Sequence, residues 1–213
     1  QVRGFIGFLL LTWLIFGTWL WAHSEHAWLD AVRIVAVNVT SVVTTTGFAL
    51  GDYTTWGSFA VLLFFYLTFV GGCSGSTSGG LKIFRFQVAY VLLKANLQQL
   101  IHPRAVIKQQ YNNHNLDEDI VRSLITFSFF FAITIALIAL GITLTGVDWV
   151  TALTGAATAV CNVGPGLGPV IGPAGNFSTL PDAAKWLLTI GMLLGRLEIL
   201  TVLVLFTRVF WKH

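Results

Sequence analysis

Two short glycine segments contain the residues with the clearest chemical potential in this chain. Residues 46–51 and 163–168 both follow the pattern x-Gly-x-x-Leu-Gly, and each comes directly after an apolar stretch rich in Ser, Thr, Ala and Val. Glycine permits backbone conformations that other residues avoid, so such loops can turn their carbonyl oxygens toward a common axis. A ring of carbonyl oxygens can replace the hydration shell of a cation. We therefore expect both segments to coordinate a dehydrated cation through their backbone.

The two segments resemble an ion-selectivity filter. Residues 45–49 read Thr-Thr-Gly-Phe-Ala and resemble the Thr-Val-Gly-Tyr-Gly filter of potassium channels, while residues 162–166 keep its Val-Gly-x-Gly frame. Each likeness is weak alone, and their matching places in a repeated unit strengthen both. The candidate ion-binding residues are Thr45, Thr46, Gly47, Phe48, Cys161, Asn162, Val163, Gly164 and Pro165.

An internal repeat relates the two segments. When Gly47 is aligned with Gly164, the acidic residues Asp30 and Asp148 fall 17 and 16 residues before their glycines. Both acidic residues suit the start of a helix. The repeated unit is therefore a span, a short pore helix, a glycine loop and a second span.

The composition places these loops in a membrane protein. Hydrophobic residues make up 55% of the 213 residues and charged residues only 10%, and the mean hydropathy is +0.79. Soluble domains carry about 25% charged residues, so most soluble enzymes, nucleic-acid binders and disordered proteins are excluded. The two cysteines and five histidines form no pattern typical of a metal site or a catalytic nucleophile. We expect no enzymatic activity and no nucleic-acid partner.

The apolar runs predict an all-α membrane protein built from two repeated span–pore helix–filter loop–span units. A membrane span needs about 20 apolar residues. Full spans are expected at 4–22, at 59–70 continued by 83–93, at 124–144 and at 183–210, with pore helices at 31–46 and 150–163. The predicted division is a first unit at 1–100, a cytoplasmic connector at 101–122 and a second unit at 123–213.

The basic residues orient this topology. If both ends of the chain are cytoplasmic, nine of the twelve Lys and Arg residues fall on the inner side, as the positive-inside rule requires. Arg33 and Lys185 fall near the outside, and Arg196 falls within the membrane. The nine inner residues are Arg3, Lys82, Arg85, Lys94, Arg104, Lys108, Arg122, Arg208 and Lys212.

A glycine- and serine-rich break interrupts the second span. Roughly 14 helical residues, with a rise of about 21 Å, precede it from Gly57, so the break falls inside the membrane below the filter. Polar backbone at that depth should face the pore. A simple kink packed against neighbouring helices is the alternative. The candidate gating residues are Gly71, Gly72, Ser74, Gly75, Ser76, Thr77, Ser78, Gly79 and Gly80, together with Arg196.

The repeat places Arg196 at the depth of this break. An arginine at mid-membrane costs about 2.5–3.5 kcal/mol on insertion scales, so it needs carbonyls, carboxylates or water. Glu198 lies about 200° away around a helix and is a poor partner. The carbonyls of residues 71–80 are better candidates, and a carboxylate from outside this chain is the alternative. We expect Arg196 and the break to close the pore at rest.

Four motifs together resemble the membrane subunit of Trk-type potassium uptake systems, in the Trk/Ktr/HKT superfamily. They lie at 44–49, 71–82, 161–166 and 195–198, and the likeness covers essentially the whole chain. The resemblance implies the third and fourth units of a four-unit pore, with potassium as the transported ion and no further cofactor. It also implies that the break and the arginine gate the pore below the filter.

The resemblance further implies a location and partners. The location is the bacterial cytoplasmic membrane. The implied partners are the amino-terminal half of the same polypeptide, a second copy in a homodimer, a cytoplasmic nucleotide-binding regulatory subunit and the lipid bilayer.

Two other functions stay open. One is a secondary transporter whose re-entrant hairpins couple another cation or substrate, although a parallel repeat favours a pore. The other is a non-conducting assembly subunit. The sequons that begin at Asn38 and Asn176 match a glycosylation pattern. We expect neither to be used, since one lies in a predicted pore helix and the resemblance is to bacterial proteins.

Overall fold

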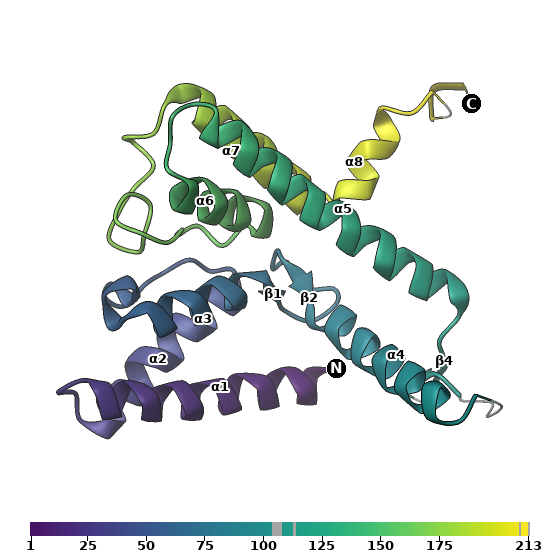
Figure 1. Cartoon of the computed structure of the whole chain (residues 1–213), viewed down its shortest axis with the longest axis horizontal. Helices are drawn as coiled ribbons and strands as arrows, with labels where there is room; N and C mark the ends of the chain where they lie inside the picture. The colour runs from purple at the N-terminus through teal and green to yellow at the C-terminus, as the bar shows by residue number, and fades with distance from the viewer. Residues whose placement is uncertain (104–107, 113, 209, 213) are drawn as a thin grey trace.

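The chain folds into a set of helices with two very short strand pairs. The computed structural model, drawn in Figure 1, describes residues 1–103, 108–112, 114–208 and 210–212. Arg104, which contributes to the predicted charge bias, lies outside these residues. The helical architecture confirms the predicted all-α class.

The first half of the chain runs from α1 to α4. Its elements are α1 (Val2–His23), α2 (Trp28–Val43), η1 (Tyr53–Trp56), α3 (Ser58–Phe69), β1 (Val70–Gly71), β2 (Leu81–Lys82) and α4 (Ile83–Ile101). The strands β1 and β2 pair in parallel.

The second half begins with a small antiparallel pair and continues with four helices. Its elements are β3 (Gln110–Tyr111), β4 (His114–Asn115), α5 (Glu118–Thr143), α6 (Trp149–Cys161), α7 (Asp182–Arg196), α8 (Ile199–Leu205) and η2 (Phe210–Lys212).

Helix lengths separate the spanning helices from the short ones. Within the described residues, α1 and α5 are each long and apolar enough to cross a membrane, and the bent pair α7–α8 gives a third crossing if it counts as one span. Helices α2 and α6 have 16 and 13 residues, which corresponds to a rise of about 24 and 20 Å. Both are too short for a hydrocarbon core about 30 Å thick, and both lie at the predicted pore-helix positions.

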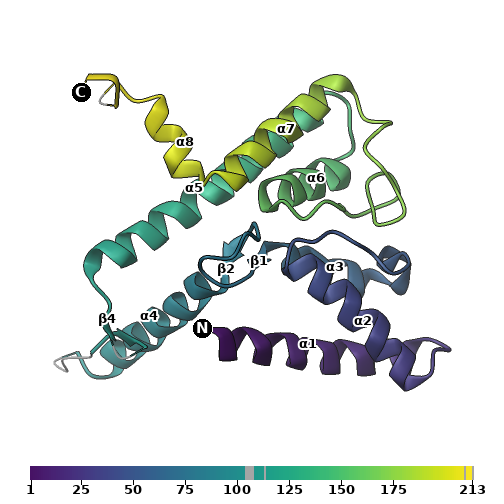
Figure 2. The ribbon, with the colours of Figure 1, turned by 180° about the vertical axis from the view of Figure 1, so that it is seen from behind.

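The two halves of the chain are arranged in similar ways. Helix α1 packs against α2, and α5 and α7 pack against α6. Figures 1 and 2 show that α1 and α5 run in the same direction. The α1–α2 connection and the start of α7 lie at one end of the molecule, and the α4–α5 connection lies at the other. The loops after α2 and α6 begin near the middle of the molecule and run toward the first end, away from the predicted cytoplasmic connector.

The two short helices begin differently. Asp148 is the N-cap of α6, and its Oδ2 accepts a hydrogen bond of 3.0 Å from the backbone N–H of Thr151. Hydrogen bonding to Thr151 lowers the pKa of the Asp148 carboxyl. Asp30 lies in the first turn of α2, as its place at a helix start predicts, but α2 begins at Trp28 and has no side-chain cap. Asp30 instead pairs with Arg33 at 3.2 Å on the surface.

The continuous last span predicted at 183–210 is wrong. Helix α7 ends at Arg196, and α8 continues at an angle of 103°. Glu198 has φ 58°, a left-handed conformation that cannot continue a right-handed helix. The sequence is largely apolar on both sides of Glu198, so an apolar pattern alone does not reveal the turn.

Helix α4 also differs from the prediction. It continues to Ile101, beyond the predicted end of the span at Leu93. The added residues 94–101 mix polar and apolar side chains, and most of them favour helix. Helix α5 already begins at Glu118, where acidic residues suit a helix start. The segment between these helices is therefore shorter than the polar sequence suggests.

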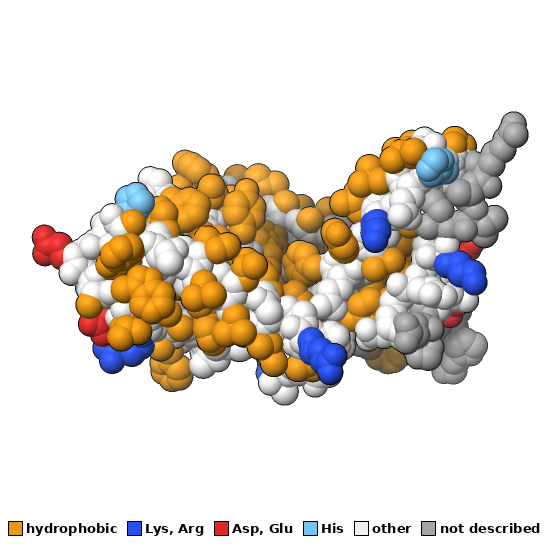
Figure 3. All heavy atoms as spheres, turned by 90° about the horizontal axis from the view of Figure 1, so that it is seen from below, with side chains coloured by type: hydrophobic (Ala, Val, Ile, Leu, Met, Phe, Trp, Pro, Cys, Tyr) orange, Lys and Arg blue, Asp and Glu red, His pale blue; other side chains and the backbone are white. Residues whose placement is uncertain are grey.

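The outer surfaces of the long helices are apolar. Large side chains such as Leu11 and Leu14 on α1, and Leu137 and Leu140 on α5, are exposed. Figure 3 shows hydrophobic side chains over much of one face, with the visible acidic groups toward its two ends. Such a surface is typical of a protein surrounded by lipid.

Helices α1 and α2 approach most closely at Gly17, and this contact predicts a packing defect. A Cβ added there would lie 2.7 Å from Cγ2 of Val32, whereas a Cβ at Gly7 on the same helix meets nothing within 4 Å. We expect Gly17→Ala to destabilise the protein by about 1–3 kcal/mol through overpacking. Thermal unfolding in detergent measures the effect, with Gly7→Ala as the matched control. Equal melting temperatures for the two variants would contradict this view of the interface.

Candidate functional site

The two glycine loops leave their helices through the same backbone conformation. Thr45 after α2 and Asn162 after α6 both have φ 56°. Gly47 and Gly164 follow with φ 84° and 116°. This left-handed region favours glycine, so both glycines are required by the path of the chain.

The backbone N–H groups of both loops point back to the pore helices. The N–H of Thr46 donates to the carbonyl of Ser41 at 2.8 Å, and the N–H of Val163 donates to the carbonyl of Thr158 at 3.0 Å. The N–H of Gly164 donates to Oγ1 of Thr158, also at 3.0 Å. These bonds give each of the three N–H groups an acceptor within the protein.

The carbonyl groups of the same peptides must therefore point the other way. In a trans peptide, N–H and C=O lie on opposite sides of the plane. The carbonyls of Thr45, Asn162 and Val163 belong to the peptides whose N–H groups face the helices. No hydrogen bond in the described part of the chain uses these three oxygens. They are free to coordinate a cation.

The two loops meet each other. A Cβ added to Gly47 would overlap the carbonyl oxygen of Val163, and one added to Gly164 would lie 3.9 Å from Cα of Gly47. A cavity of about 440 Å³ opens beside them. It is lined by Thr45, Thr46, Thr158, Ala159, Asn162, Val163, Gly164, Phe177, Lys185, Leu188, Thr189 and Met192. Five of the nine candidate ion-binding residues therefore line one cavity.

The other candidate residues lie around this cavity rather than in it. Cys161 is buried at the end of α6, while the side chain of Phe48 is 78% exposed. The ring of Pro165 lies 3.5 Å from the position of a Cβ at Gly47. Only their backbone, not their side chains, can contribute to an ion path at the loops.

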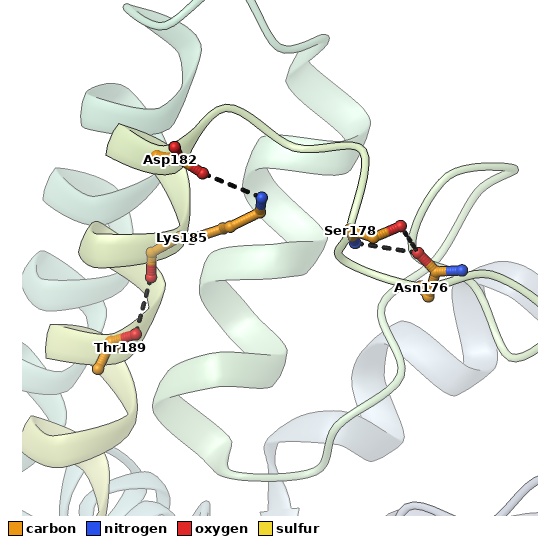
Figure 4. A network of polar contacts seen from close by, with 5 residues as sticks. All are labelled: Asn176, Ser178, Asp182, Lys185 and Thr189. Carbon is orange, nitrogen blue, oxygen red and sulfur yellow. Dashed lines mark hydrogen bonds and ion pairs between the residues drawn. The ribbon is translucent and has the colours of Figure 1, made fainter.

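The loops continue into similar turns at the outer end. Oδ1 of Asp52 accepts from the N–H of Thr54 at 2.9 Å, and Oδ1 of Asn176 accepts from the N–H of Ser178 at 2.9 Å. Figure 4 shows the second turn beside the start of α7, where Lys185 pairs with Asp182 at 3.1 Å.

The predicted break forms a compact polar loop between β1 and β2. Within it, Oγ of Ser78 accepts from the N–H of Gly72 at 2.9 Å, and the N–H of Ser76 donates to the carbonyl of Cys73 at 3.0 Å. The ammonium of Lys82 donates to the carbonyl of Ser76 at 2.8 Å and also to that of Ser78. A single lysine thus holds two turns of the loop.

This loop contacts both glycine loops and Arg196. The N–H of Gly79 donates to Oγ1 of Thr45 at 3.0 Å, and a Cβ at Gly79 would overlap the carbonyl oxygen of Cys161. The guanidinium of Arg196 donates to the carbonyl of Thr77. Gly71, Gly72 and Gly80 lie at the ends of the loop, and Ser74 and Gly75 are exposed at its tip.

A polar cavity of about 220 Å³ lies beside the loop. Three cations and one carboxylate line it together with loop residues, and Arg85 stacks over the ring of Phe127 at 3.7 Å. The lining residues are Ser76, Thr77, Ser78, Gly79, Gly80, Lys82, Arg85, Phe127, Gly195, Arg196 and Glu198. In the described residues, no group of three His, Cys, Asp or Glu side chains could hold a metal ion.

Sequence reasoning missed several residues of this site. Lys82 belongs to the 71–82 motif and to the predicted charge bias, but its bonds to the loop are not among the predictions. Ser41 and Thr158 in the short helices receive N–H groups of the loops through their backbone carbonyls, which residue type does not signal. Thr158 also accepts through Oγ1, so for Thr158 a polar residue within a short apolar helix is the signal.

The short helices, their glycine loops and the surrounding apolar helices define a pore-forming membrane protein. The family model for TrkH, described as a cation transport protein, matches residues 5–212. The chain therefore belongs to the TrkH family.

Individual relatives support the same membership. The chain is 59% identical to the Trk system potassium uptake protein TrkI of Halomonas elongata over 213 residues, which is 100% of this chain and 43% of that protein. It is 37% identical to TrkH of Salmonella typhimurium over 214 residues, with 100% and 44% covered. The chain thus spans less than half the length of these relatives.

A solved structure shares the fold. The crystal structure of the potassium transporter TrkH from Vibrio parahaemolyticus matches with a TM-score of 0.90 and 34% identity, over 99% of this chain and 44% of that one. The names of these three proteins describe uptake or transport and no enzymatic reaction.

The contacts of Lys82 predict that it stabilises the polar loop. We expect Lys82→Met to remove the hydrogen bonds to Ser76 and Ser78 and to raise amide exchange across residues 72–80 by about tenfold, since a charged hydrogen bond contributes about 1.5–3 kcal/mol. Hydrogen–deuterium exchange measures this. Lys94→Met, at an exposed position of α4, which follows Lys82 directly, is the control. Unchanged exchange in the loop would contradict the assigned role.

Proposed function

We propose that this chain forms half of a potassium-selective pore, in which backbone carbonyls of the two glycine loops coordinate the dehydrated ion. The observation that carries the proposal is the orientation of the loop peptides. Their N–H groups bond to the pore helices, and the carbonyls of Thr45, Asn162 and Val163 face the other way without partners in the described residues. Membership of the TrkH family and the names of the relatives support potassium as the ion.

The complete pore requires further units. Two additional span–pore helix–loop–span units upstream would close a four-unit ring, with residues 1–100 and 123–213 as the third and fourth units. The proposal places the protein in the bacterial cytoplasmic membrane with both ends of this chain inside. Lipid would surround the apolar outer surface of the chain. The complete protein would act with a second copy and with a cytoplasmic nucleotide-binding regulatory subunit.

The polar loop at 71–80 and Arg196 would form the gate. The loop lies directly against both glycine loops through Gly79, and Arg196 bonds to its Thr77 carbonyl. A positive charge at this point repels a cation leaving the filter. Opening would require the arginine and the loop to separate.

A pore is favoured over a coupled secondary transporter. Many such transporters use inverted repeats with a site at mid-membrane. In this chain α1 and α5 run in the same direction (Figures 1 and 2), and each is followed by a short helix and a loop. Units that run in the same direction can be related by a pseudosymmetry axis along the membrane normal, which is the arrangement of a pore.

The filter assignment predicts a loss of selectivity when its glycines gain a side chain. Gly47→Ser or Gly164→Ser in the full-length protein should reduce the preference for potassium over sodium by about tenfold, which corresponds to about 1.4 kcal/mol, because the new Cβ strains the loop and, at Gly47, displaces the Val163 carbonyl. Sodium competition against potassium uptake in vesicles measures this.

The control for these variants is Gly146→Ser. Gly146 has φ 87°, and a Cβ there meets nothing within 4 Å. It lies between α5 and α6, outside both glycine loops, so its replacement introduces similar backbone strain away from the proposed filter. If both filter variants compete with sodium as the unmodified protein does, the filter lies elsewhere.

The gate assignment predicts a gain of flux. Arg196→Ala should raise the potassium flux several-fold in reconstituted vesicles, since it removes both the positive charge and the bond to Thr77. Arg33→Ala, which removes a surface arginine paired only with Asp30 at 3.2 Å, is the control. Unchanged flux at normal protein yield would refute the gate.

A further inference from the structure

Asn38 of α2 bonds to Leu50, which lies in the part of the first glycine loop that follows Gly47. We call this part of each loop its outer limb, and the part that joins the short helix to the glycine its inner limb. Nδ2 of Asn38 donates to the carbonyl of Leu50 at 3.0 Å, and the N–H of Leu50 donates to Oδ1 of Asn38 at 2.8 Å. One side-chain amide thus satisfies both polar groups of Leu50, as a neighbouring strand would. The Asn38 residue is 0% exposed.

Thr154 of α6 has the corresponding position in the second loop. The N–H of Leu167 donates to Oγ1 of Thr154 at 3.2 Å, and the same hydroxyl lies 3.3 Å from the carbonyl of Leu167. Leu50 and Leu167 are the leucines of the two x-Gly-x-x-Leu-Gly segments. Different residue types, one position apart in the repeat alignment, therefore make the same attachment.

The two attachments differ in strength. The Asn38 amide has two N–H groups, one for Leu50 and one for the carbonyl of Ile34 at 3.0 Å. The Thr154 hydroxyl has one proton to share between Leu167 and the carbonyl of Val150, which lies at 2.8 Å. The attachment at Asn38 is the stronger one.

We propose that Asn38 and Thr154 are positioning residues that set ion selectivity by fixing the outer limb of each filter loop to its pore helix. This inference rests on the proposed filter. Ser41 and Thr158 bind the inner limb through the residues next to Gly47 and Gly164. With both limbs attached, the carbonyls cannot move inward to suit a smaller ion.

The burial of Asn38 also explains why the sequon that begins at this residue should not be glycosylated. Its amide is directed at Leu50 inside the protein and is not available to a modifying enzyme. The polar side chain of Asn38 therefore supports the proposed filter loop instead of carrying a glycan.

The experiment uses isosteric variants of the full-length protein in vesicles. Thr154→Val removes the hydroxyl and keeps the shape, whereas Thr154→Ser restores the hydroxyl. We expect Thr154→Val to lower the preference for potassium over sodium by about tenfold and Thr154→Ser to retain it. Asn38→Leu, which removes the stronger attachment, should lower the preference further.

Thr12→Val is the matched control. Thr12 is 9% exposed and Thr154 is 7% exposed, and Thr12 likewise bonds to the carbonyl four residues earlier, at 2.8 Å to Phe8. Its replacement should leave selectivity unchanged. If Asn38→Leu does not assemble, the comparison of Thr154→Val with Thr154→Ser decides alone.

The outcomes separate this inference from the proposed filter. Unchanged selectivity in Thr154→Val and Asn38→Leu, or a uniform loss of flux with no change in selectivity, overturns the positioning role. If the glycine variants still lose selectivity in that case, the filter itself stands. If no variant of either set changes selectivity, the filter assignment also fails.

Discussion

The structure depends on the need to satisfy polar backbone inside an apolar environment. A loop within a membrane has no bulk water to bind its N–H and C=O groups. In both glycine loops the helix that precedes the loop supplies the acceptors, through the carbonyls of Ser41 and Thr158. The loop N–H groups are thereby bonded to the preceding helix, and the carbonyl oxygens of the same peptides face away from that helix. The constraint that stabilises the loop therefore also produces the surface of free carbonyl oxygens on which the proposed ion coordination rests.

The same constraint shapes the polar loop that contacts the two glycine loops. Its serines bond to each other and to the backbone, and Lys82 and Arg196 donate to its carbonyls. Charged groups inside a membrane are costly unless they have such partners. The same loop contacts Thr45 and Cys161 through Gly79. The proposed filter and the proposed gate are therefore one connected polar region.

Much of this arrangement could be predicted from local pattern. The apolar runs predicted the all-α class and the helices at the pore-helix positions, and the glycine–serine composition located the break. The predictions were wrong where the hydropathy pattern does not determine the backbone geometry. Glu198 turns the backbone within the segment predicted as one span, and α4 continues through a mixed polar and apolar stretch to Ile101. The roles of the individual site residues and the four-unit pore stay predictions.

The sequence by itself determined which segments enter the membrane and where glycine must break the helices, because burial of apolar surface and the freedom of glycine are local properties. Only the tertiary structure decided which polar side chains support the loops. Asn38 and Thr154 make the same kind of attachment one position apart in the repeat alignment. Lys82 of β2 and Arg196 of α7 bond to the same loop from distant parts of the sequence. Such contacts depend on the direction of side chains in the folded chain, which spacing along the sequence does not specify.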